Sequence, residues 1–309
     1  MMTLEVSVII PTFNRRPMVV EAILSVLAQR EVGFELIVVD DGSTDGTPAA
    51  VEETLEDATA PMRFIRTERR GVAAARNLGV EAAAAPLIGF LDSDDLWKPE
   101  KLSRQLAYLR DHREYRISQC NESWVRNGRR VNPGLRHLKH AGDVFIGSLR
   151  TCLISPSAVI METDLFRDLG GFDETMTAGE DYDLWLRILL RYEVGLLEEM
   201  LVVRRAGHGD QLSATVPAID RFRILALAKL LAAPELTGVK RIATAEVLAE
   251  KSRLYANGLQ RRKRDASLYE EIALRALQNW ARDSDPALAL TLTELQKRNR
   301  QEAPPGSPQ

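Results

Sequence analysis

Residues 35–47 read ELIVVDDGSTDGT, a short apolar run that ends in an acidic turn containing glycine and small polar residues. The run has the length and the β-branched content of a buried strand. Comparable runs occupy residues 6–10, 63–66 and 87–91. Apolar residues with helical spacing at 19–27 and an alanine-rich stretch at 72–84 lie between them. Alternating strands and helices of this kind predict an α/β fold with a mainly parallel sheet.

Turn-forming residues mark further element boundaries. Thr47-Pro48 predicts the cap and the first position of a helix. Asn127-Gly128 predicts a tight β-hairpin, because both residues readily take positive φ angles. Residues 157–161 are apolar enough to return a strand to the sheet, and Gly170-Gly171 predicts the end of a short helix.

The strand signals nearly vanish beyond Val216, where the remaining sequence has helical spacing. We therefore expect a catalytic or binding domain over residues 1–215 and a helical C-terminal extension over residues 216–302. The Pro- and Gly-rich residues 303–309 predict a disordered tail.

Composition excludes several classes of protein. Hydrophobic residues make up 45% and charged residues 28% of the 309 residues, as in folded globular proteins. The net charge of −3 provides no basic field for nucleic acid. The two cysteines lack zinc-site spacing and favour a reducing compartment. No signal peptide or membrane span is apparent, so we expect a cytoplasmic protein. Peripheral contact with the inner face of the membrane and homo-oligomerisation stay open.

Acidic residues follow two of the predicted strands. Residues 40–45 follow the second strand and residues 92–95 follow the fourth. The carboxyl ends of parallel strands meet at one edge, so these carboxylates are expected to gather there. A divalent cation would relieve their repulsion, and oxygen ligands favour Mg²⁺ or Mn²⁺. The first strand leads into residues 11–16, which contain neither GxGxxG nor GxxxxGK[ST], so dinucleotide and P-loop sites are disfavoured.

Five blocks of sequence resemble the family 2 glycosyltransferases of the GT-A fold, in the order found in that family. The blocks are VSVIIPTFNR (6–15), ELIVVDDGSTDGT (35–47), RGVAAARNLGV (70–80), FLDSDDLWKPEKL (90–102) and LGGFDETMTAGEDYDLWLRI (169–188). The resemblance implies a Rossmann-like nucleotide-diphospho-sugar domain. It also implies an inverting, metal-dependent hexosyl- or N-acetylhexosaminyltransferase that uses a nucleotide diphosphate sugar, with UDP- or dTDP-sugars expected.

The resemblance also assigns site residues. Nucleotide contacts are expected from Pro11, Thr12, Phe13, Asn14, Asp41, Arg76, Asp92 and Ser93. The metal ligands are expected to be Asp94 and His208, which would hold Mn²⁺ or Mg²⁺. Asp181 matches the general base and Glu180 is its acidic partner, so both are expected to be catalytic. The role expected for Asp181 is chemically reasonable, since a carboxylate near the acceptor hydroxyl can take its proton.

The acceptor is expected to be a hydroxyl of a polysaccharide, a lipid-linked glycan or a protein glycan, as in cell-envelope synthesis. The absence of a QxxRW segment favours addition of a single sugar. A nucleotidyltransferase is the alternative enzyme, but it would normally carry a Gly-rich, lysine-containing loop after the first strand. A phosphatase would carry its nucleophilic aspartate there, whereas this DxD follows the fourth strand. A non-catalytic sugar-nucleotide binding module is the third alternative.

Overall fold

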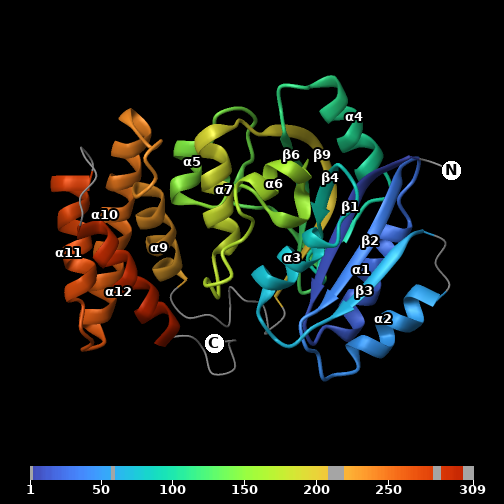
Figure 1. The fold of residues 1–309 in the computed structure, drawn as a ribbon, viewed down its shortest axis with the longest axis horizontal. Helices are drawn as coiled ribbons and strands as arrows, with labels where there is room; N and C mark the ends of the chain where they lie inside the picture. Colours follow the sequence, from blue (N-terminus) through green and yellow to red (C-terminus); the bar gives the residue numbers. More distant parts are fainter. Residues whose placement is uncertain (1–2, 57–59, 208–218, 281–286, 302–309) are drawn as a thin grey trace.

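The computed structural model describes residues 3–56, 60–207, 219–280 and 287–301. Within these residues a nine-stranded sheet forms the centre of the N-terminal part (Figure 1). Its strands are β1 (Leu4–Thr12), β2 (Gly33–Asp40), β3 (Met62–Arg66), β4 (Leu87–Phe90), β5 (Leu96–Trp97), β6 (Ile117–Arg126), β7 (Arg129–Val131), β8 (Val159–Glu162) and β9 (Gly195–Ala206).

The strands follow the order β3-β2-β1-β4-β8-β6-β9-β5, with β7 paired to β6. The first four are parallel, as predicted; Ile9 of β1 lies opposite Ile37 of β2 and Phe90 of β4. Beyond β4 the sheet is mixed, because β8 runs antiparallel to both β4 and β6, whereas β6 and β9 are parallel. The parallel half therefore holds the strand ends at which the acidic turns were expected.

Helices cover both faces of the sheet. They are α1 (Arg16–Leu27), α2 (Thr47–Glu56), α3 (Val72–Glu81), α4 (Lys101–Asp111), α5 (Phe145–Arg150), α6 (Thr163–Asp168) and α7 (Glu180–Arg191). Successive strand residues point to opposite faces. Val8 and Ile10 accordingly pack in the core beneath α1, α2 and α4, while Ile9 packs in the core beneath α3, α6 and α7. The result is a three-layer α/β/α arrangement.

Local predictions hold with small shifts. The hairpin between β6 and β7 forms, with Asn127 and Gly128 at positive φ angles. Helix α2 begins at Thr47 itself, because Asp45 accepts hydrogen bonds from the Thr47 backbone N–H and hydroxyl. The predicted strand at 157–161 begins two residues later, after a 3₁₀ turn over Pro156–Ala158. Ser157 is therefore in a turn and not in the sheet.

The C-terminal part is helical, as expected, in the residues described. It comprises α9 (Asp220–Leu231), α10 (Gly238–Arg261), α11 (Ser267–Arg275), a π-helical turn (Ala276–Trp280) and α12 (Ala287–Gln301). Figure 1 shows these helices beside α5 and α7, away from the parallel strands. Buried Trp185 and Leu186 of α7 belong to the same hydrophobic core as Phe222 and Leu225 of α9. None of the helices in the described ranges has the length and hydrophobicity needed to cross a bilayer.

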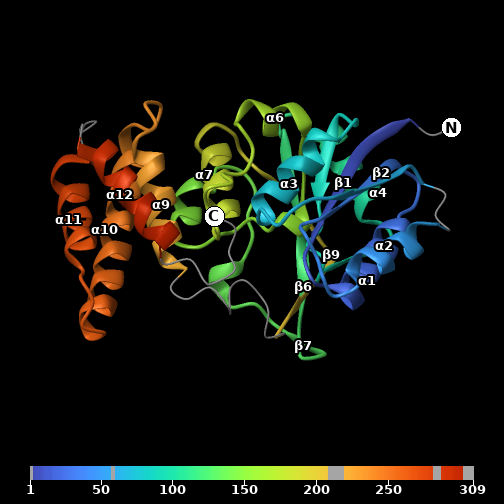
Figure 2. The same cartoon turned by 60° about the horizontal axis from the view of Figure 1, so that its bottom comes forward.

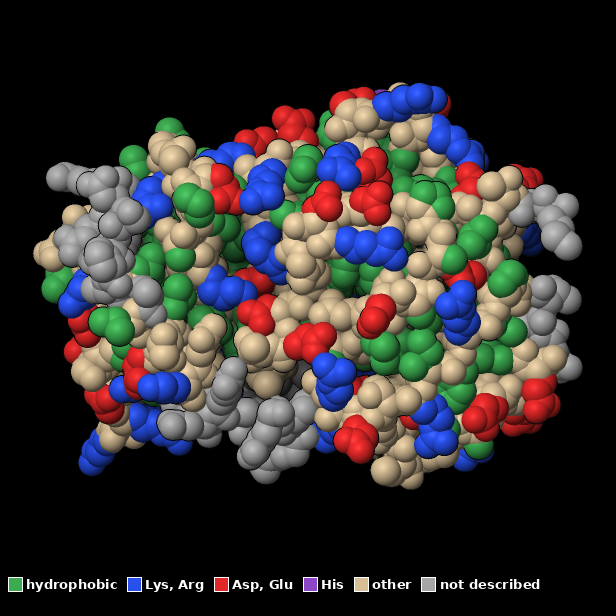
Figure 3. Space-filling view, viewed as in Figure 1, with side chains coloured by type: hydrophobic (Ala, Val, Ile, Leu, Met, Phe, Trp, Pro, Cys, Tyr) green, Lys and Arg blue, Asp and Glu red, His purple; other side chains and the backbone are tan. Residues whose placement is uncertain are grey.

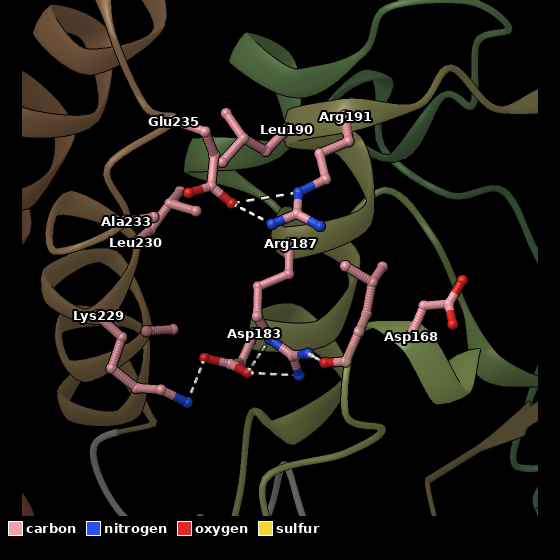
Figure 4. A pocket seen from close by; sticks show the side chains of 11 residues that line it. Asp168, Asp183, Arg187, Leu190, Arg191, Lys229, Leu230, Ala233 and Glu235 are labelled. Carbon is pink, nitrogen blue, oxygen red and sulfur yellow. Dashed lines mark hydrogen bonds and ion pairs between the residues drawn. The ribbon is translucent and has the colours of Figure 1, made fainter. Parts of the chain in front are cut away.

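Charged residues line the contact between α7 and α9, where a cavity of about 230 Å³ lies (Figure 4). Lys229 of α9 donates to Asp183 of α7 at 2.7 Å and to Asp173 at 2.5 Å. Arg187 contacts the same Asp183 carboxylate at 2.9 Å, and the Asp183 side chain is only 2% exposed.

On the outer surface, Figure 3 shows basic and acidic side chains interspersed, in line with the small net charge.

Candidate active site

The candidate site follows the carboxyl ends of β2, β1 and β4, which are neighbours in the sheet. The Asp41 backbone N–H donates to the Thr12 carbonyl at 2.9 Å, and the Leu91 N–H donates to the Ile9 carbonyl at 3.0 Å. The turns after these three strands therefore form one continuous edge. In open α/β sheets this edge is where ligands bind.

Asp41 anchors the loop that precedes α3. Its Oδ1 accepts the backbone N–H of Arg70 at 2.7 Å, and its Oδ2 accepts that of Gly71 at 2.8 Å. Burial raises the pKa of Asp41, although these two hydrogen bonds and nearby Arg69 act in the opposite direction. The structure thus shows a loop contact that the sequence did not indicate, at a residue predicted to contact the nucleotide base.

The turn after β1 is tied to the turn after β2. Asn14, at a φ of 50°, donates its backbone N–H to the Ser43 hydroxyl at 2.8 Å and accepts the Thr44 N–H at 2.9 Å. Pro11 and Thr12 are buried at the end of β1. These hydrogen bonds hold the two turns side by side.

Phe13 lies half-buried in the same turn, and the Arg69 guanidinium lies 4.0 Å from the centre of its ring. This cation–π pair joins the turn after β1 to the loop before α3. It forms next to the Asp41 anchor, because Arg69 directly precedes Arg70. Arg69 was not among the predicted site residues.

Asp92, Asp94 and Asp95 follow β4 and form an acidic cluster, with one carboxylate oxygen from each within 4.8 Å of the others. Asp95 is buried; it accepts the Ser157 hydroxyl at 2.7 Å and the Arg205 N–H at 2.9 Å. Burial and the charges of Asp94 and Asp92 raise its pKa well above the usual range. Such crowded, hard oxygen donors fit a divalent cation. Asp92 and Asp94 are the less buried members and suit direct ligation, while buried Ser93 lies between them.

Arg76 of α3 joins the acidic cluster to the start of α7. Its guanidinium bonds Asp92 at 2.6 Å and Glu180 at 2.7 Å, and the side chain is 5% exposed. Burial alone would lower the pKa of Arg76, but the two carboxylates raise it above its usual range. The residue predicted to reach the nucleotide therefore also holds two distant acidic segments together.

Glu180 and Asp181 open α7 immediately after Gly179, which has a φ of 72°. Glu180 is buried against Arg76; burial and the Asp181 charge raise its pKa to about 7, partly offset by Arg76. Asp181 is half-buried and turns toward Cys152, whose thiol donates to Asp181 Oδ2 at 3.9 Å. The two neighbouring acids thus face different surroundings, and Asp181 is the more accessible one.

Two further residues of the site, besides Arg69, were missed by sequence reasoning. Ser157 donates to Asp95 and accepts the Asp92 N–H at 3.1 Å, while Arg205 of β9 contacts the Asp94 carbonyl and Asp95. A single serine or arginine far along the chain carries no local signal of this role. His208, the second predicted metal ligand, lies outside the described residues.

Comparison with known proteins gives the family. A family model described as "Glycosyl transferase family 2" matches residues 7–170. An uncharacterized glycosyltransferase of Rickettsia felis is 33% identical over 66% of this chain and 33% of its own length. One of Rickettsia typhi is 29% identical over 71% of this chain and 70% of its own. The chain thus spans about a third of the length of the first curated relatives that it matches.

Solved structures show the same fold. S. aureus TarS 1-349 in complex with UDP-GlcNAc superposes with a TM-score of 0.69 at 21% identity, covering 96% of this chain and 89% of that one. The mannosyltransferase PcManGT from Pyrobaculum calidifontis, in complex with GDP-Man and Mn²⁺, gives a TM-score of 0.56 at 22% identity, covering 96% and 82%. The chain therefore belongs to glycosyl transferase family 2 and has the GT-A fold.

Proposed function

We propose that the protein is an inverting, metal-dependent glycosyltransferase that moves a hexosyl or N-acetylhexosaminyl group from a UDP- or dTDP-sugar to an acceptor hydroxyl. The observation that carries this proposal is the Arg76 bridge. It joins the acidic cluster, suited to a cation and a diphosphate, to Glu180, the neighbour of the proposed base Asp181. The two halves of the proposed transfer site would therefore lie side by side, joined by Arg76.

Asp41 and Phe13 would hold the donor's base. A carboxylate oxygen keeps acceptor capacity after one hydrogen bond, so Asp41 can anchor its loop and still accept the imide N–H of uracil or thymine. Phe13, with Arg69 stacked on it, offers a flat surface for the base or ribose. Pro11, Thr12 and Asn14 would contribute by fixing the turn, and the UDP-GlcNAc in the TarS complex supports this class of donor.

Asp92 and Asp94 would hold Mn²⁺ or Mg²⁺, with His208 as a further proposed ligand. The bound ion would neutralise the charge that builds on the leaving nucleoside diphosphate. The Mn²⁺ in the mannosyltransferase complex supports a cation in this fold. Asp95 is buried and would act by bracing the cluster against β9, through its hydrogen bonds from Ser157 and Arg205.

Asp181 would take the proton of the acceptor hydroxyl as that oxygen attacks the anomeric carbon. Attack on the face opposite the leaving diphosphate inverts the anomeric centre. Glu180 would position the start of α7 through Arg76. The acceptor would be a polysaccharide, a lipid-linked glycan or a protein glycan. We further propose that residues 1–215 form the catalytic domain and residues 216–302 an extension on the acceptor side.

Thermal shift with a panel of nucleotide sugars, with and without Mn²⁺, tests the donor and metal assignments together. A donor that binds only the folded protein at 100 times its Kd adds about 2.7 kcal/mol of stability. We expect a UDP- or dTDP-sugar to give this shift only with the cation. EDTA and Asp94→Ala should both abolish it, whereas Asp111→Ala, at an exposed acid of α4, should not. Full activity in chelated buffer would contradict metal dependence.

A further inference from the structure

The β6–β7 hairpin and the segment after it form a basic arm, defined here as residues 123–142. These residues contain Arg126, Arg129, Arg130, Arg136 and Lys139 but no Asp or Glu, in a chain whose net charge is −3. Figure 2 shows the β7 hairpin projecting from the body of the protein. Positive charge is therefore concentrated on a protruding segment.

Two polar side chains of the arm, those of His137 and Lys139, pack against β6. The His137 ring lies 5.2 Å from the Trp124 ring of β6. Lys139 donates to the Cys120 carbonyl at 3.0 Å and lies 3.5 Å from Glu122, with both charged side chains almost fully buried. These three contacts fix residues 137–139 of the arm against β6.

Apolar side chains of the arm turn outward. Leu135 is 85% exposed, Leu138 is 48% exposed and Val131 is 36% exposed. The hairpin arginines Arg126 and Arg129 of the same arm are exposed as well. For a surface in contact with water alone, the reverse arrangement, with leucine buried and lysine exposed, would be more stable.

We propose that the arm docks the protein on an anionic membrane surface. Exposed leucines can enter the boundary between headgroups and acyl chains, while arginines pair with lipid phosphates. A soluble polyanion would engage the arginines but would give the leucines no role. The combination of charge and outward apolar side chains therefore favours a lipid surface.

Docking would bring the active site close to the membrane. The Arg204 guanidinium lies 4.9 Å from the Trp124 ring, and the next residue, Arg205, bonds Asp95 of the acidic cluster. The arm and the cluster are thus joined through β6 and β9. Membrane docking itself does not depend on the transfer reaction; the consequence that acceptors are met at a lipid surface rests on the proposed function.

Co-sedimentation of the full chain with vesicles tests the proposal. We expect binding to vesicles that contain phosphatidylglycerol and little binding to pure phosphatidylcholine. The triple variant Arg126→Gln, Arg129→Gln, Arg130→Gln should bind about 100-fold more weakly, at about fivefold for each arginine. The double variant Leu135→Ser, Leu138→Ser should lose about tenfold or more.

Matched controls lie at the far end of the protein. Arg261→Gln, Arg262→Gln, Arg264→Gln removes the same charge from exposed residues, and Leu254→Ser removes a leucine that is 64% exposed. Both should bind vesicles as the unmodified protein does. Equal loss in the two arginine triples would show a net-charge effect and overturn the proposal. No effect of the leucine pair would overturn it in favour of a soluble polyanion.

Fluorescence gives a second readout that does not rely on the leucine pair folding normally. Leu135→Trp should show a blue shift of tryptophan emission when anionic vesicles are added, and Leu254→Trp should not. An unshifted spectrum of Leu135→Trp in the presence of bound vesicles would exclude insertion of the arm. A UDP thermal shift run on each variant reports separately on the donor site.

Discussion

Arg76 gives the neighbouring acids Glu180 and Asp181 different surroundings. It holds Glu180 in a buried ion pair, while Asp181 remains half-buried beside Cys152. The acidic pair could be predicted from the sequence, because its block resembles the family motif. The difference in their surroundings could not be predicted, since it depends on an arginine 104 residues away from Glu180. The same holds for Asp41, whose anchoring of Arg70 and Gly71 requires the folded loop.

Asp181→Asn should lower the transfer rate by about 10² to 10⁴, the usual contribution of a general base. The amide keeps the shape of the side chain but cannot accept the acceptor's proton. Donor affinity should stay near normal, because Asp181 takes no part in the proposed donor contacts. Kinetics and UDP calorimetry measure the two effects separately, and Glu180→Gln is expected to cost less. A fully active Asp181→Asn enzyme, or a product that retains the donor's anomeric configuration, would contradict the mechanism.

Glu180 should make stability depend on pH. Its pKa rises from 4.5 to about 7 on folding, mainly through burial. Between these values the folded protein holds a proton that the unfolded chain has lost, so stability falls as pH rises, and the full penalty is present above about pH 7. The penalty should be on the order of 1 to 3 kcal/mol. Urea unfolding near pH 5 and near pH 8 measures this effect. The unfolding free energy should change less between the two pH values for Glu180→Gln than for the unmodified protein. An equal change in both proteins would exclude this titration.

Helix α3 illustrates what can be predicted about an element and what cannot. Its alanine-rich sequence predicts the helix, and the apolar runs predict the four parallel strands below it. The order of β8, β6 and β9 could not be predicted, because pairing in a mixed sheet is decided by tertiary contacts. The close packing of α3 on the sheet also depends on tertiary structure. A Cβ added at Gly79 would lie 2.4 Å from Cγ2 of Ile9 in β1.

Gly79→Ala should lift α3 from the sheet, and Arg76, one turn earlier, should move with it. We expect a loss of about 1–3 kcal/mol in unfolding free energy together with weaker donor binding. Gly147→Ala in α5 is the control, since its Cβ would meet Leu153 at an ordinary 3.4 Å. Adding Ile9→Ala should make the Gly79→Ala cost smaller than the sum of the two single costs. Strict additivity would mean that the two side chains do not clash.

The C-terminal helices share their hydrophobic core with the N-terminal part. Their helical character could be predicted from sequence periodicity. The packing of α9 on α7, the helix that carries Asp181, could not, because it depends on tertiary contacts. Phe222 of α9 lies in the same buried cluster as Trp185 of α7. Lys229 adds a buried ionic contact to Asp183 across this interface. The extension is thus part of the folding unit.

Removal of everything beyond Pro217 should therefore prevent cooperative folding, because apolar residues of α7 would be exposed to water. Circular dichroism and size-exclusion chromatography would show this. The point variant Lys229→Met should be milder, costing about 1–3 kcal/mol in unfolding free energy while UDP affinity is kept. A monomeric fragment with a sharp unfolding transition would show that the N-terminal part folds alone.

Cys152, whose thiol contacts Asp181, allows the surroundings of the proposed base to be probed by chemical modification. The other cysteine, Cys120, is fully buried, so an alkylating reagent should react with the native protein at Cys152. Burial and the Asp181 charge raise the pKa of Cys152, so alkylation should be slow at neutral pH and faster in alkali. A bulky adduct there would crowd Asp181 and block transfer. Acceptor analogues should protect the thiol, whereas a nucleotide held at Asp41 should leave it open to the reagent.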